Sequence, residues 1–180
     1  MASEVVVVQR RRRYRWPEVQ LNIWIFIQLV AAGFLLGVFA DFLAIQQQLR
    51  LGTPWLFPYM ITVASLTLLA ILVMLILINQ RMLLPGVIVL ASFILFVLWL
   101  TGLIETAIQL YGPANVNGNC NRYVYHEEQH GQSLNTLAWL EQYNICNLWR
   151  AAFAFEIIGS VFFFWMMIMA WQVSRETYDM

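Results

Sequence analysis

Four long apolar runs constrain the fold more than any other feature of this 180-residue chain. Each run is long enough to cross a bilayer, which takes about 20 residues at a rise of about 1.5 Å each. Because the hydrocarbon offers no partners to backbone N–H and C=O groups, each run is predicted to be a helix. The predicted spans are Leu21–Ile45, Pro58–Ile78, Gly86–Leu110 and Leu148–Val173.

The composition points to the same class of protein. Hydrophobic residues make up 61% of the chain and charged residues 11%, against about 45–50% and about 25% in soluble domains. We therefore predict an all-α, polytopic membrane protein with a four-transmembrane-helix bundle. Its expected parts are an arginine-rich cytoplasmic tail over 1–20, a membrane domain over 21–173 with an outer loop over 111–147, and a cytoplasmic tail over 174–180.

The distribution of arginines predicts the orientation. With the N-terminus in the cytoplasm, seven of the ten basic residues fall on the cytoplasmic side, namely the five before residue 16 together with Arg81 and Arg175. The three on the other side are Arg50, Arg122 and Arg150. An excess of positive charge marks cytoplasmic segments, so both termini are expected in the cytoplasm.

The arginines of the N-terminal tail also predict a contact with lipid. Basic residues just cytoplasmic of a span attract anionic lipid at about 1 kcal/mol each. The alternative is that they only set the topology, and the two roles are compatible. Nucleic-acid binding is not expected, because a membrane anchor follows directly. The residues concerned are Arg10, Arg11, Arg12, Arg13 and Arg15.

The segment between the third and fourth spans holds both cysteines of the chain, Cys120 and Cys146. The expected orientation places this segment in the lumen or outside the cell, where thiol pairs are oxidised. We therefore predict a disulfide, which stabilises the loop by about 3–4 kcal/mol on the chain-entropy model. Two free thiols are the alternative.

The same segment contains H-E-x-x-H, His126 to His130, the spacing of a zinc protease helix. The two variable positions are Glu128 and Gln129, which suit a solvated surface rather than an enzyme interior. A third metal ligand is also needed, and no third histidine follows. We interpret the pattern as a coincidence. Haem is not expected either, because the spans contain no histidine. No metal, cofactor or catalytic residue is predicted.

Three carboxylates inside the spans call for an explanation, because an ionisable group in hydrocarbon is costly. Asp41, Glu105 and Glu156 all fall in the outer half of their spans, on the side of Arg150. One interpretation is a path for protons or cations. The other is structural: neutral or arginine-paired carboxyl groups that hold the helices together. The second is the one we favour, and it predicts one intramembrane polar cluster of these four residues.

Small residues near the carboxylates predict the packed helix faces. Gly33 and Gly37 form a G-x-x-x-G that continues to Asp41, while Gly102 precedes Glu105 and Gly159 follows Glu156. Small residues let helices approach closely. These glycines are therefore expected to face the interior of the bundle.

The chain resembles the MARVEL-domain proteins, and most of all their short fungal members. The shared features are four spans, two cytoplasmic termini, a short first and a longer second outer loop, and a charged residue in the fourth span. The resemblance covers about residues 20–173. It is strongest over Cys146–Trp171, "CNLWRAAFAFEIIGSVFFFWMMIMAW", where a cysteine and an aromatic entry lead into a span with a buried acid. Claudins and tetraspanins fit less well, because the first outer loop is short and cysteines are few.

The resemblance implies a membrane-organising role without chemistry: forming or sorting membrane patches or protein assemblies. Its partners would be the bilayer with its anionic lipids, and other membrane proteins or further copies of itself. The location would be the plasma membrane or the secretory and endosomal pathway. Two alternatives stay open, a small accessory subunit of a larger membrane complex and a proton- or cation-coupled transporter or channel component.

Overall fold

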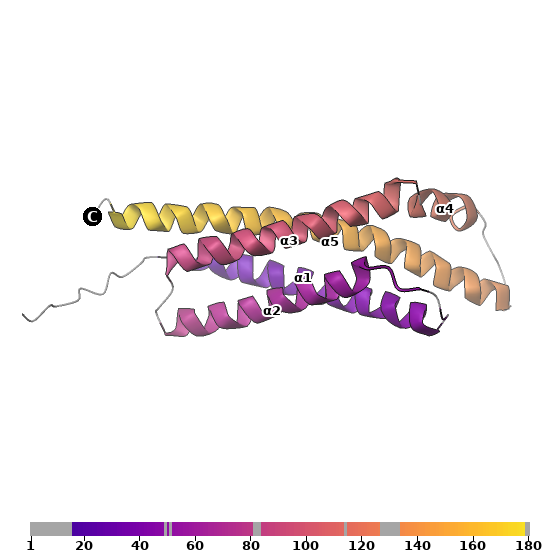
Figure 1. The fold of residues 1–180 in the computed structure, drawn as a ribbon, viewed down its shortest axis with the longest axis horizontal. Coiled ribbons are helices and arrows are strands. Elements are labelled where there is room, and N and C mark those ends of the chain that lie inside the picture. Colours follow the sequence, from indigo (N-terminus) through magenta and orange to yellow (C-terminus); the bar gives the residue numbers. More distant parts are fainter. Residues whose placement is uncertain are drawn as a thin grey trace, which may run out of the picture.

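The computed structural model describes residues 16–48, 50, 52–80, 84–113, 115–126 and 134–178. Over these residues the chain forms helices and no strand (Figure 1). The helices are α1 (Glu18–Gln48), α2 (Leu56–Asn79), α3 (Pro85–Tyr111), α4 (Val116–Tyr123) and α5 (Leu134–Tyr178). The arginines from Arg10 to Arg15 lie outside the described residues.

Four of these helices, α1, α2, α3 and α5, are long and apolar enough to cross a membrane. They contain the four predicted spans, and α1, α2 and α3 extend beyond them by only a few residues. This arrangement is compatible with a multi-pass integral membrane protein.

The fourth long helix differs from its prediction. The outer segment 111–147 was expected to be a loop, but it contains α4, and α5 begins at Leu134, well before the predicted span. With its 45 residues, α5 is about 67 Å long, roughly twice the thickness of the hydrocarbon core. Hydropathy missed this extension because polar residues interrupt its apolar ones, and because the contacts that hold it come from segments distant in sequence.

The four long helices run alternately in opposite directions and pack side by side (Figure 1). α5 packs along both α1 and α3, α1 also packs along α2, and the contact between α2 and α3 is the least extensive of these four. The start of α1 and the C-terminal end of α5 lie at one end of the bundle. α4 and the first turns of α5 lie at the other end.

Large aromatic and apolar side chains fill the middle of the bundle, with Trp99, Phe39 and Phe163 among the largest that are fully buried. The outer surface is apolar as well: Phe26, Leu69 and Leu90 are each at least 60% exposed. Soluble monomers rarely expose a continuous apolar surface of this kind, whereas lipid covers it at no cost.

Local sequence signals explain where the helices begin and end. Pro85 occupies the first turn of α3, where a missing N–H costs no hydrogen bond. At the other end, the backbone N–H of Gly112 donates to the carbonyl of Ile108. Asn115 caps α4: its side chain accepts a hydrogen bond from the N–H of Gly118, and its backbone has a positive φ of 35°. Asparagine tolerates this left-handed conformation better than most residues.

Candidate functional site

Buried polar side chains occur at several depths along the bundle. They come from all four long helices: Gln28 of α1, Thr67 of α2, Ser92 and Thr106 of α3, and Glu156 and Ser160 of α5. Buried polar groups are costly unless they are hydrogen-bonded, so their hydrogen-bond partners indicate what these side chains do.

Two side chains of α1 reach the backbone of α5. The indole N–H of Trp24 donates to the carbonyl of Phe162 over 2.7 Å. The amide Nε2 of Gln28 donates to the carbonyl of Gly159 over 2.8 Å. These carbonyls belong to the interior of a helix and already accept bonds there, so α1 uses their second lone pair. The two bonds fix the register of α1 against α5.

Glu156 is fully buried at the interface of α3 and α5. The Thr106 hydroxyl of α3 donates to its Oε1 over 3.0 Å. The other carboxyl oxygen, Oε2, is buried without a hydrogen-bond partner, and so is Oε1 of Gln28. Ser160 donates to the backbone carbonyl of Glu156, one turn back on the same helix. The carboxyl group therefore joins α5 to α3 through one bond to a neutral hydroxyl.

Trp99 connects α3 to α2. Its indole N–H donates to Thr67 Oγ1 over 2.9 Å, and that hydroxyl donates in turn to the carbonyl of Val63. Farther along the same pair of helices, the Tyr59 hydroxyl donates to the carbonyl of Leu98 over 2.9 Å. The helix pairs α1–α5, α3–α5 and α2–α3 are thus each linked by at least one side-chain hydrogen bond.

Gly102 and Gly159 lie directly against large side chains of neighbouring residues. A methyl group on Gly159 would collide with the ring of Trp99, and one on Gly102 would collide with the thioether of Met60. Both glycines are buried, as expected from their place beside the carboxylates.

The expectation for Gly33, Gly37 and Asp41 is wrong. All three are exposed on the outer side of α1, and no atom lies within 4 Å of a Cβ built on either glycine. α1 turns a different face to its neighbours, the one carrying Gln28, Leu35 and other large side chains. The apolar pattern is nearly uniform around this helix, and the two glycines from which its packed face was predicted lie on the opposite side.

The predicted intramembrane cluster of four charged residues does not form either. Glu156 binds Thr106, whereas Glu105 is half-buried and accepts a hydrogen bond from Gln109 on its own helix. Arg150 is exposed and bonds Asn117, and Asp41 points away from the bundle. Similar depth along neighbouring helices does not bring side chains together when they face in different directions around their axes.

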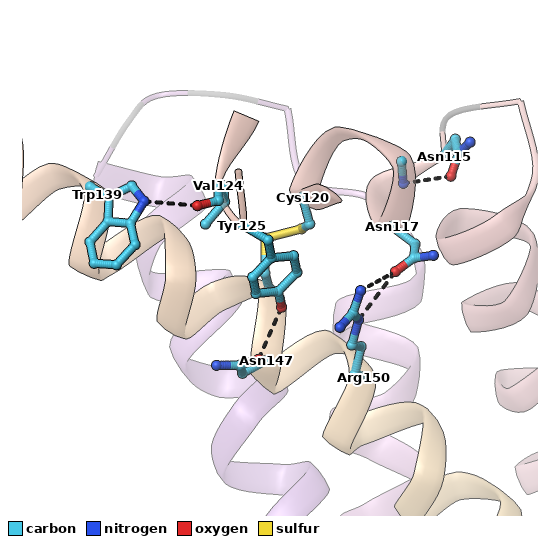
Figure 2. The surroundings of a disulfide bond; sticks show 10 residues. Asn115, Asn117, Cys120, Val124, Tyr125, Trp139, Asn147 and Arg150 are labelled. Atoms are coloured by element: carbon cyan, nitrogen blue, oxygen red, sulfur yellow. Dashed lines mark hydrogen bonds between the residues drawn. A yellow bond between two sulfur atoms is a disulfide. The ribbon is translucent and has the colours of Figure 1, made fainter. Parts of the chain in front are cut away.

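Arg150 belongs instead to a second polar assembly at the end of the bundle, which we call the headpiece: residues 115–126 and 134–150. The predicted disulfide between Cys120 of α4 and Cys146 of α5 is present, with 6.0 Å between the Cα atoms. Figure 2 shows that polar contacts lie on both sides of it.

The contacts beside the disulfide join α4 and the turn after it to α5. Arg150 donates to Asn117 Oδ1 from both Nε and Nη2, over 3.1 and 2.6 Å, and its guanidinium lies 4.7 Å from the centre of the Tyr125 ring. The Tyr125 hydroxyl donates to Asn147 Oδ1, and the Trp139 indole donates to the carbonyl of Val124 (Figure 2). α4 is therefore clamped to α5 through Asn117 and Cys120, and the turn after it through Val124 and Tyr125.

Of the H-E-x-x-H pattern, the structure describes only His126, whose Nδ1 lies 2.6 Å from the carbonyl oxygen of Asn121. The remaining residues, His130 included, lie outside the described residues. Among the described residues, no three His, Cys, Asp or Glu side chains lie close enough together to hold a metal ion.

Sequence reasoning missed most of the buried polar side chains. Gln28 was the visible signal, a lone amide in the middle of an apolar run, and Trp99 was another, an indole far from the ends of its span. Thr106 and Thr67 carried no comparable signal, because threonine often bonds its own helix backbone.

Comparisons of the chain with protein-family models, with curated proteins and with solved structures gave no match.

Proposed function

We propose that this chain is a non-enzymatic, multi-pass integral membrane protein that organises or sorts neighbouring proteins and lipid patches, and that the headpiece engages those neighbours. The observation that carries the proposal is the clamp between α4 and α5, in which a disulfide and the Arg150–Asn117 bonds fix a polar headpiece to a membrane helix. A headpiece held in one orientation loses little conformational entropy when it binds a partner.

The proposal includes an orientation. Both termini face the cytoplasm, and the headpiece lies in the lumen or outside the cell, at the plasma membrane or along the secretory and endosomal pathway. The uneven arginines support this orientation, and a disulfide persists only on the oxidising side. On the cytoplasmic face, the arginines from Arg10 to Arg15 attract anionic lipid.

The surface of the headpiece offers side chains suited to a partner. Tyr123 is 58% exposed and Leu140 is 51% exposed. Tyrosine supplies a large contact area with few rotatable bonds and is enriched at interfaces. The resemblance of Cys146–Trp171 to MARVEL-domain proteins supports the same role.

Imaging of the tagged protein in cells tests this role. Wild-type protein should concentrate in patches, and the pair Tyr123→Ser and Leu140→Ser should disperse it. Leu69→Ala, a change on the exposed surface of α2, is the matched control and should leave the patches unchanged. A uniform distribution of wild-type protein would overturn the proposal.

A second candidate, a small accessory subunit of a larger membrane complex, is favoured by the exposed side of α1. Gly33, Gly37 and Asp41 point away from the bundle, and intramembrane acids usually face protein rather than lipid. Gly37→Leu should then release the protein from a complex of fixed composition on a blue native gel. Ile23→Ala, elsewhere on the exposed surface of α1, should not. Co-migration that survives Gly37→Leu argues against this candidate.

A further inference from the structure

Where the headpiece meets the other helices lies a half-open cavity of about 400 Å³, lined by residues from all five helices and from the connection before α2. Its volume falls within the range of roughly 300–1,000 Å³ that is typical of ligand pockets. Aromatic rings form one wall. Phe42 of α1, Phe57 of α2 and Trp149 of α5 contact one another, with ring centres between 5.3 and 6.0 Å apart.

Two amides provide the polar part of the lining. Gln46 lies one helical turn beyond Phe42, and its Oε1 is buried without a hydrogen-bond partner. Gln109 of α3 donates its Nε2 to Glu105 and keeps its own carbonyl oxygen as an acceptor. A buried acceptor without a donor costs free energy that a ligand hydroxyl would recover.

No charged side chain is among the described residues that line the cavity. A phosphate or an ammonium group inside it would lose part of its hydration without gaining a counter-charge from the lining. The lining therefore suits a molecule with an apolar body and an uncharged head that donates a hydrogen bond.

The disulfide fixes the far wall. Val116 of α4 and Ile145 of α5 both line the cavity. Ile145 directly precedes Cys146, and Val116 lies one helical turn before Cys120, so the bond between the two cysteines holds both side chains in place. The walls are thus partly set before any ligand arrives.

We propose that this cavity binds a neutral, hydroxyl-bearing lipid, with its apolar body against the aromatic wall and its hydroxyl donating to Gln46. The inference rests on the membrane placement of the proposed function but not on its organising role. Diacylglycerols and sterols share the required chemistry and reach the site from the surrounding leaflet.

The test is photo-crosslinking of the purified full chain in liposomes, which contain no other protein. The probes are a photoactivatable diacylglycerol, a photoactivatable sterol and a photoactivatable phosphatidylcholine, each used at the same mole fraction. One or both neutral probes should label peptides that contain Gln46 or Ile145. The probe that does so shows whether the ligand is a diacylglycerol or a sterol. Labelling there by phosphatidylcholine to the same extent, or by none of the three, overturns the proposal.

Two variants define the contacts. Gln46→Leu removes the acceptor and should lower labelling roughly fivefold, the equivalent of one ordinary hydrogen bond. Gln47→Leu, at the exposed neighbouring position, is the matched control and should not change labelling.

Ile145→Trp fills the space and should abolish labelling while the Cys120–Cys146 disulfide still forms, as measured by peptide mass spectrometry. Equal labelling of all three variants and the wild type overturns the proposal. The liposomes contain no other protein, so this result does not depend on the organising role. Failure of the lipid proposal would therefore leave the imaging test of the organising role unaffected, and the two proposals fail separately.

Discussion

At the scale of single residues, hydrogen bonds between side chains and distant backbone decide how the helices meet. Gln28 and Trp24 bond carbonyls of α5, and Thr106 bonds Glu156. Burial of apolar side chains gives little preference for one register in lipid, because lipid tails solvate them about as well as a neighbouring helix does; close packing and hydrogen bonds must supply it. Glu156 is therefore best explained as one half of a helix-to-helix bond, which agrees with the structural interpretation of the intramembrane acids.

Substitution at Glu156 measures that bond. Glu156→Gln keeps an acceptor for Thr106 and should change the melting temperature in detergent little. Glu156→Leu leaves the Thr106 hydroxyl without its partner and should lower the free energy of unfolding by about 1–3 kcal/mol. A double-mutant cycle with Thr106→Val isolates the pair and should give a coupling of about 1 kcal/mol.

The transporter alternative predicts a different result at the same position. If Glu156 carries protons or cations, Glu156→Gln should abolish flux in liposomes while melting stays unchanged. Such an outcome would favour ion transport over the structural role.

The glycines give a second prediction at this scale. Gly159→Ala places a methyl group against Trp99, whose ring is fully buried and hydrogen-bonded to Thr67 and so has little room to move. The free energy of unfolding should fall by about 1–3 kcal/mol. Gly37→Ala is the control: the added methyl group meets open space, and alanine is the better helix former. Equal melting temperatures for the two variants would contradict the assigned packing.

At the scale of the elements, the headpiece depends on contacts between segments that cannot stand alone. α4 has eight residues, and isolated helices shorter than about 12–15 residues are marginal in water. The disulfide and the Arg150–Asn117 bonds supply the stability that so short a helix lacks. They attach α4 to the part of α5 that continues beyond the bundle.

Removal of the disulfide tests this dependence. In a variant with both Cys120→Ser and Cys146→Ser, protease added to the headpiece side should cleave within 115–126 much faster, because closing the loop stabilises it by about 3–4 kcal/mol. The four long helices should stay intact. Asn119→Ser, at an exposed position next to Cys120, should be cleaved at the wild-type rate. Unchanged cleavage of the double variant would show that the hydrogen bonds suffice.

At the scale of the whole molecule, the sequence predicted the helical class, the four long apolar helices and the disulfide, because length and hydropathy limit what lipid can accommodate. It failed where orientation around a helix axis matters, at Gly33, Gly37 and Asp41. A helix that is apolar on all sides carries no amphipathic signal to mark its packed face. The extension of α5 and the cavity beneath the headpiece depend on contacts between distant segments, which no local pattern encodes.

The proposed orientation is a prediction for the molecule as a whole. In sealed, right-side-out vesicles, external protease should spare tags at the N- and C-termini. A biotin reagent that reacts with tyrosine and does not cross the membrane should label Tyr123 from outside, because this side chain is well exposed on α4. Digestion of either tag would contradict the orientation.

The central claim is that the chain brings membrane components together through a rigid headpiece. Excision of native membrane into polymer-bounded discs, without detergent, tests it most directly, with mass spectrometry and single-molecule photobleaching to count what each disc contains. We predict that discs with the wild-type chain hold further copies or other membrane proteins in variable ratio, and that the Cys120→Ser, Cys146→Ser double variant is found alone. Discs in which the wild-type chain is a solitary monomer would contradict the account.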